Sequence, residues 1–203
     1  DRSDLFVAVG VIVIVGMLII PLPTFLLDTL MAINLVLSLL IILIVLYIKR
    51  ALEFSIFPTM LLVTTVFSLA LNVSSTRLIL SQGSDFDGRI VRAFGSFVVG
   101  TAGTEGLVIG IIIFVIIVAV QFIVITKGAV RVAEVAARFT LDAMPAKQMA
   151  IEAEYNAGAI TEEESQQRKN DLQRESDFYG AMDGASKFVQ GNVMVGILIT
   201  LIN

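Results

Sequence analysis

The sequence predicts an all-α, polytopic membrane protein with a small helical cytoplasmic loop domain between its fourth and fifth transmembrane helices. Hydrophobic residues make up 57% of the 203 residues and charged residues only 16%, whereas a soluble domain is about 45–50% apolar and about 25% charged. Several nearly uncharged runs also reach the length of about 20 residues that crosses a bilayer as a helix. Disorder is excluded, because it requires low hydrophobicity and high net charge.

The residue types that are missing narrow the function further. The chain has no cysteine and no histidine, so a disulfide framework, a thiolate metal site and the commonest general base are all excluded. We therefore expect no enzyme, no cofactor and no metal site. The net charge of −4 comes without a strongly basic face, which argues against nucleic acid as a partner.

The transmembrane region is expected in residues 1–126. Its helices are expected at about 5–22, 24–48, 54–80 and 105–126. The third is the weakest, because it turns polar in its last third, which should face protein or water rather than lipid. Residues 191–203 open a fifth helix, and the apolar run that starts at Val193 covers only half a bilayer, so we expect the sequence to stop inside that span.

Orientation follows from the basic residues. Of the 14 Lys and Arg, all but Arg77, Arg89 and Arg92 fall on one side of the expected spans. The positive-inside rule places that side, including the N-terminus and residues 127–190, in the cytoplasm. The loop 81–104 then lies in the periplasm, where residues from Arg89 form either a short interfacial helix or an ordinary ordered loop.

The cytoplasmic domain, residues 127–190, is expected to contain three helices. The first ends near Pro145, and the second stops at Gly158, since glycine commonly ends helices. The third starts at Thr161, which forms a capping box with Glu164. This segment has too few apolar residues for a large core of its own, so we expect it to pack on the membrane helices or on neighbouring copies.

Charged residues cluster in this domain. Arg131, Glu134, Arg138 and Asp142 are three, four and four residues apart and share one helical face with alternating sign. They form either a solvated ladder of ion pairs or a charged lining at a pore mouth that relays ions or holds a gate. The spacing of Asp183 and Lys187 predicts that they pair with each other or with these arginines.

Polar residues also occur inside the second span. Asp28 either marks an ion pathway or is wetted at the outer interface, because an ionised side chain in mid-bilayer is costly. Asn34 and Ser38, four residues apart, are expected to form hydrogen bonds between helices.

At the level of motifs, the chain resembles the large export-gate family of bacterial flagellar and virulence type III secretion, with the flagellar branch nearest. The resemblance covers essentially the whole chain and is strongest from Arg131 to Pro145 and from Glu175 to Val189. It also includes the Pro21-Leu-Pro hairpin that leads to Asp28, the Thr76-Arg77 pair, and the Phe178-Tyr-Gly-Ala-Met-Asp183-Gly-Ala run.

The resemblance implies a multi-pass protein of the bacterial inner membrane. It would form a homo-oligomeric ring, expected to be a nonamer, with other membrane components of the export apparatus. The ring would pass exported protein substrates and couple their passage to protons or sodium ions. The charges that matter in the family map onto Arg77, Arg131, Arg138, Asp142 and Lys187.

Three positions depart from the family pattern. Ala146 stands where glycine is expected, Ser68 where arginine is expected, and Asn192 where an acidic residue is expected. Asparagine has the shape of a protonated aspartate but cannot titrate. Coupling would then use another carboxylate, such as Asp142 or Asp183, or Asn192 mimics the protonated state.

Two other functions remain open. A stand-alone ion channel or secondary transporter would carry charges on several spans, and a passive scaffold of the secretion machine would not depend on the charges of the cytoplasmic domain.

Overall fold

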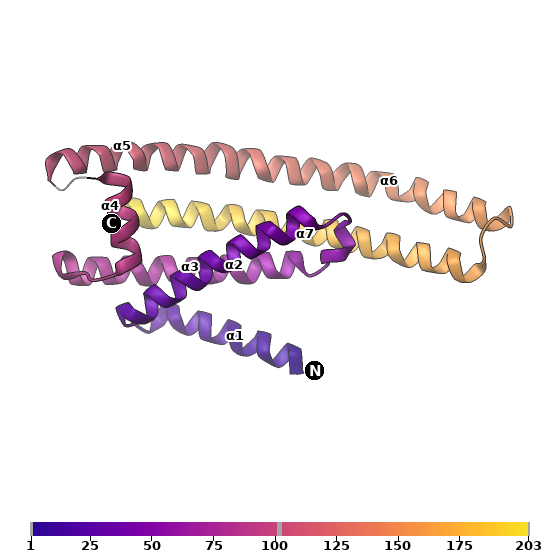
Figure 1. Ribbon diagram of the computed structural model, residues 1–203. Coiled ribbons are helices and arrows are strands. Elements are labelled where there is room, and N and C mark those ends of the chain that lie inside the picture. The colour runs from indigo at the N-terminus through magenta and orange to yellow at the C-terminus, as the bar shows by residue number, and fades with distance from the viewer. Residues whose placement is uncertain (1, 101–102, 203) are drawn as a thin grey trace.

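The computed structural model describes residues 2–100 and 103–202, and every regular element among them is a helix (Figure 1). Five of the helices are long and apolar enough to cross a membrane. They are α1 (Arg2–Ile19), α2 (Thr24–Tyr47), α3 (Phe57–Gln82), the helix that starts with α5 (Thr104–Val120), and α7 (Glu162–Ile202). These helices confirm the all-α, polytopic membrane class.

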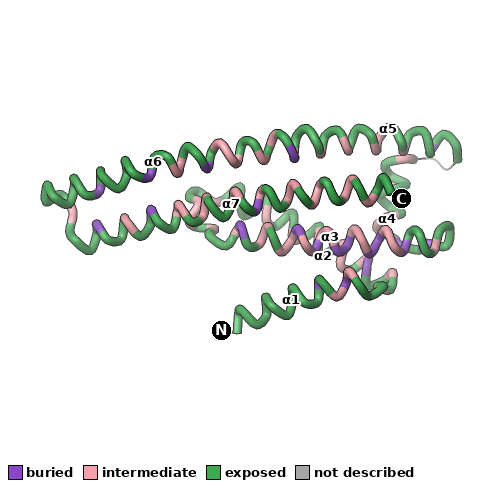
Figure 2. The backbone as a smooth tube through the Cα atoms, turned by 180° about the vertical axis from the view of Figure 1, so that it is seen from behind, coloured by how far each residue is buried: buried purple, intermediate pink, exposed green. Residues whose placement is uncertain are grey.

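The first three helices share the main core. A short hairpin at Pro21-Leu22-Pro23 joins α1 to α2, and the 3₁₀ helix η1 (Ala51–Phe54) leads from α2 to α3. Half of the buried apolar side chains of this core come from α3, which carries much of the purple in Figure 2. The whole set is Ile14, Met17, Leu27, Phe67, Ala70, Leu71, Leu78 and Phe86.

A short helix lies across the ends of the long ones. After the 3₁₀ helix η2 (Gly83–Asp85), α4 (Arg89–Val99) runs crosswise from the end of α3 to the start of α5 (Figure 1). This confirms a helix in the expected loop 81–104, of which residues 101–102 lie outside the described residues. Phe94 and Phe97 on α4 are 56% and 87% exposed.

The second half of the chain is one long helical hairpin. α5 continues through the π-helix η3 (Gln121–Ala129) into α6 (Val130–Asn156), and α7 returns beside it (Figure 1). The sequence placed domain boundaries after residues 126 and 190, and both positions lie inside unbroken helix. The loop region is therefore a direct extension of the apolar helices, and the domain division stays a prediction.

The expected helix end near Pro145 is wrong. Pro145 stands inside α6, which continues to Asn156. Proline removes one amide donor and frees the carbonyl four residues earlier, that of Leu141. Pro145 is exposed, so its ring lies on the outer side of the helix, where the loosened turn is open to water. The packing of α6 on α7 then keeps the helix intact.

The turn between α6 and α7 has the helix end and the helix cap that the sequence predicts. Gly158 has a φ of 73°, a left-handed conformation that favours glycine at a helix end. The backbone amide of Glu164 donates to the Thr161 hydroxyl at 3.2 Å, which confirms the expected cap of α7. Behind the turn, Met144 and Ile151 of α6 pack on Leu172 of α7.

Candidate functional site

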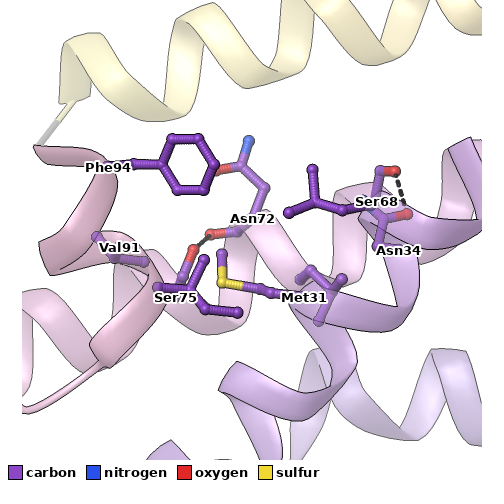
Figure 3. Close-up of a pocket in the computed structure, with 10 residues that line it drawn as sticks. Met31, Asn34, Ser68, Asn72, Ser75, Val91 and Phe94 are labelled. Carbon is purple, nitrogen blue, oxygen red and sulfur yellow. Dashed lines mark hydrogen bonds between the residues drawn. The ribbon is translucent and has the colours of Figure 1, made fainter. Parts of the chain in front are cut away.

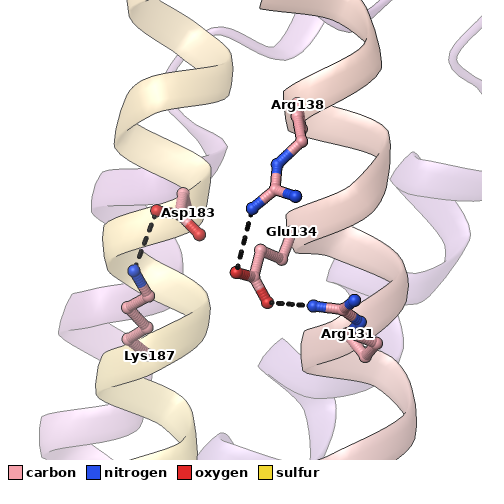
Figure 4. Close-up of polar contacts among 5 residues, drawn as sticks. All are labelled: Arg131, Glu134, Arg138, Asp183 and Lys187. Carbon is pink, nitrogen blue, oxygen red and sulfur yellow. Dashed lines mark hydrogen bonds and ion pairs between the residues drawn. The ribbon is translucent and has the colours of Figure 1, made fainter.

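The charged ladder forms along α6 (Figure 4). Arg131 Nη1 lies 3.3 Å from Glu134 Oε2, and Arg138 Nη2 lies 4.0 Å from Glu134 Oε1. The two arginine side chains are 65% and 67% exposed, so the pairs contribute only about 0.3–0.5 kcal/mol each. The ladder therefore adds little stability, and its charges stay available to other groups.

Asp183 and Lys187 pair with each other on the facing helix. Lys187 Nζ donates to Asp183 Oδ2 at 3.1 Å along α7, and no ion pair joins this pair to the α6 arginines within residues 2–100 and 103–202 (Figure 4). The first of the two alternatives that the sequence left open is therefore the observed one. The two charged helices face each other without a direct bridge.

A cavity of about 270 Å³ separates the two sets of charges. Its lining includes Glu134, Arg138 and Asp142 from α6, together with Gly180 and Asp183 from α7. Asp142 makes no hydrogen bond or ion pair among the described residues. Three carboxylates, of which Asp142 is exposed, and a guanidinium around one solvated space can bind a proton or a small cation, or accept a basic group from another molecule.

Asp28 is bound to the start of α4. Its carboxylate accepts hydrogen bonds from the backbone amides of Arg89 at 3.0 Å and Ile90 at 3.3 Å. These amides start α4, whose N-cap residue, Gly88, offers no side-chain cap. Because helix N-termini carry unpaired amides and a partial positive charge, a carboxylate is favourable there. Asp28 is thus the anchor that ties α2 to α4.

Arg77 has the complementary role at a helix C-terminus. Its guanidinium donates to the backbone carbonyls of Leu18 and of Ile19, the latter at 3.1 Å. These are among the last carbonyls of α1, which lack partners within the helix. Arg77 of α3 therefore closes α1, and its charge is engaged by the backbone.

Asn34 forms the expected bond between helices. Its Oδ1 accepts from the Ser68 hydroxyl of α3 at 3.2 Å (Figure 3), whereas Ser38 donates to the Asn34 backbone carbonyl within α2. Asn34 and Ser68 lie in the lining of a groove of about 490 Å³, together with Asn72 and Phe94. The family resemblance expects arginine at position 68. Because serine stands there in this chain, the contact with Asn34 joins two uncharged side chains.

Asn192 lies apart from the charged hairpin. It lines a cavity of about 330 Å³ between α3, α5 and α7, together with Asn72, Gln121 and Thr200. All four polar side chains are neutral, so this cavity contains amide and hydroxyl groups and no titratable group. The expected coupling residues thus fall into two places, the hairpin cavity and this neutral cavity.

The sequence reasoning missed the π-helix η3. Thr126 is buried, and its hydroxyl donates to the Gln121 carbonyl five residues earlier at 3.4 Å, the spacing of a π turn. A Cβ atom on Gly128 would lie 3.3 Å from the Ile123 carbonyl. Such segments occur frequently at functional sites. The sequence signal for this π-helix was the interruption of an apolar run by Gln121, Thr126 and Gly128.

The helices and the buried polar contacts define a class: an all-α, multi-span membrane protein whose apolar helices extend into a charged hairpin. The comparison with family models makes this specific, because residues 14–203 match the FHIPEP family. The chain therefore belongs to that family. No solved structure matches the chain.

The curated relatives agree over the whole chain. It is 67% identical over 203 residues to flagellar biosynthesis protein FlhA of Borreliella burgdorferi, and 61% identical over 201 residues to that of Treponema pallidum. It is 52% identical over 196 residues, 95% of the chain, to FlhA of Escherichia coli. The chain spans only 28–29% of the length of these relatives.

Proposed function

We propose that this chain is part of an export-gate component of the flagellar type III secretion apparatus in the bacterial inner membrane. The protein acts as a homo-oligomeric ring that passes exported proteins, and it is a transport component rather than an enzyme. Family membership and the high identity to proteins named for flagellar biosynthesis support this role. The basic residues favour a hairpin that projects into the cytoplasm.

We further propose that the hairpin cavity couples export to the proton or sodium motive force. The observation that carries this proposal is Asp142, a carboxylate without a partner among the described residues, which lines the cavity beside Arg138 of its own helix and opposite Asp183 of α7. An unpaired carboxylate can change its protonation or bind a cation without first breaking an ion pair. Its occupancy then alters the balance of charge between α6 and α7.

The roles of Asp28 and Arg77 weigh against a stand-alone channel. A pathway through the bundle of this chain needs charges that face it, but both of these charges are engaged by helix ends. The passive scaffold remains the competing function, because weak exposed ion pairs on a hairpin are also compatible with a purely structural role.

The test replaces Asp142→Asn in the full-length protein and measures flagellar proteins secreted into the medium. Membrane abundance and ring assembly are measured in parallel. Asp171→Asn is the matched control, because Asp171 is an exposed carboxylate of α7 whose one ion pair among the described residues is with Arg174, at 3.8 Å. We expect at least a tenfold loss of export in Asp142→Asn with normal assembly, and normal export in the control. Normal export in both variants would favour the scaffold.

A further inference from the structure

The outer face of α6 exposes a continuous row of apolar side chains. Val132 and Phe139 are 70% and 73% exposed. Exposed alanines continue the row with alternating spacings of four and three residues, the pattern with which one helix packs along another. We call this row the α6 seam; it consists of Val132, Ala136, Phe139, Ala143, Ala146, Ala150 and Ala153.

The α6 seam is covered neither by lipid nor by the described residues of its own chain. Arg131 and Arg138, which are 65% and 67% exposed, flank it, and exposed charges do not lie in the hydrocarbon core. The seam also points away from α7: Ala137 is buried and lines the cavity toward α7, and Phe139 lies two residues, about 200°, around the helix. An exposed apolar strip of this length calls for a protein partner.

The α7 helix offers a face of the opposite shape. Gly180, Gly184 and Gly191 are exposed, and a Cβ atom added at any of them would meet nothing within 4 Å. We call these three residues the α7 glycine groove; Gly180, at its edge, also lines the hairpin cavity. Small residues let a second helix approach the backbone closely, so this face accepts large side chains such as phenylalanine.

The two faces match in level and in spacing. Lys147 of α6 forms an ion pair with Glu175 of α7, so these two residues lie at the same height along the hairpin. Counting residues from this pair in opposite directions along the two antiparallel helices places Phe139 within one residue of the height of Gly184. The same count brings Val132 within one residue of Gly191. Each row has steps of seven and then four residues, from 132 through 139 to 143 and from 191 through 184 to 180.

Charge favours the same alignment. Arg138 precedes Phe139, and among the residues that the structure describes its guanidinium makes only a 4.0 Å ion pair, with Glu134. Asp183 precedes Gly184 and is 35% exposed. Because the two helices run antiparallel, seating Phe139 over Gly184 of another copy leaves Arg138 two residues, about 3 Å along the axis, from that copy's Asp183, a distance that the long arginine side chain spans.

We propose that a second copy of this chain covers both faces: the α6 seam of one copy packs into the α7 glycine groove of the next, with Phe139 over Gly184. Both faces belong to one chain and point in different directions, so a second copy presents each face with its complement at the matching level. The contact is head-to-tail, the type that builds rings when the rotation closes. This inference rests on the proposed function in taking the protein to act as a ring.

The test uses the absence of cysteine from this chain. The full-length protein, with any cysteine outside residues 1–203 replaced, receives the pair Phe139→Cys and Gly184→Cys and is oxidised in membranes. The control pair is Phe139→Cys with Glu163→Cys, which lies about 20 residues, or roughly 30 Å, from the matching level. We expect a ladder of disulfide-linked multimers on a non-reducing gel for the first pair and at least tenfold less for the control.

A second variant tests the shape of the groove. Gly184→Leu meets open space within its own chain, so the subunit should fold and reach the membrane normally while multimers fall at least tenfold on a native gel. Gly10→Leu, another open glycine, is the matched control and should assemble normally. Assembly of Gly184→Leu at the wild-type level would overturn the proposed contact.

The remaining outcomes separate this inference from the proposed function. If the full-length protein assembles but the 139–184 pair gives no more cross-linking than the control, the contact is wrong and the ring stands. Cross-links to a different protein alone would assign the seam to another partner and also overturn the inference. Failure of the wild-type protein to assemble would overturn both.

Discussion

Replacing Asp28 with alanine should loosen α4 while leaving the rest of the fold in place. The substitution removes the acceptor of the Arg89 and Ile90 amides, at 3.0 and 3.3 Å, from a helix whose own N-cap gives no side-chain bond. Loss of a cap costs about 0.5–2 kcal/mol, of which the charge of a carboxylate at a helix N-terminus accounts for about 0.3–1 kcal/mol. We therefore expect about 1–2 kcal/mol, which is about a 5–30-fold change in local opening.

Hydrogen–deuterium exchange on the full-length protein in lipid nanodiscs measures this opening directly. Amides of α4 should exchange about 5–30 times faster in Asp28→Ala and by an intermediate factor in Asp28→Asn, which keeps an acceptor but loses the charge. Thr29→Ala is the matched control, since within residues 2–100 and 103–202 the Thr29 hydroxyl donates only to the Phe25 carbonyl of its own helix. Unchanged α4 exchange in Asp28→Ala, or equal acceleration in the control, would refute the anchoring role.

Two further substitutions test the backbone arguments. Arg77→Met should leave the final α1 carbonyls without their donor, at a cost of about 1–3 kcal/mol. Limited proteolysis should then cut faster between α1 and α2, and Arg77→Lys should recover part of the protection. Equal cutting rates in Arg77→Met and the wild type would contradict this. Pro145→Ala should return a backbone amide donor to the exposed side of α6 and stabilise the hairpin by about 1–3 kcal/mol. The expected readout is slower amide exchange around Leu141. Faster exchange there would show that the proline supports the helix.

The sequence predicted those features of the fold that depend on local patterns. Long apolar runs identified the spans, and the Thr161–Glu164 spacing identified the start of α7 because a helix cap is a contact between near neighbours. Gly158 signalled the turn for the same reason. Pro145 misled because its local cost is smaller than the stabilisation that α6 gains from packing on α7, and packing partners are not visible in a local pattern.

The polar residues were harder to interpret for a related reason. The carboxylate of Asp28 meets amides 61 and 62 residues away, and Arg77 reaches carbonyls 58 and 59 residues away. Both residues serve the backbone rather than another side chain, so no pairing of charges in the sequence indicates their role. Asn34 was easier, because an amide inside an apolar helix nearly always requires a partner on a neighbouring helix.

The unbroken passage from α5 through η3 into α6 gives the molecule a mechanical property. The helix from Thr104 to Asn156 has 53 residues, about 80 Å at 1.5 Å per residue, and contains no loop that could absorb strain. A sideways force on the hairpin turn is therefore transmitted along the whole helix, and the membrane-spanning part of that helix tilts in response. The π-helix η3 also sets the rotation of α6 about its axis relative to α5, because each residue added or removed in η3 rotates α6 by about 100°.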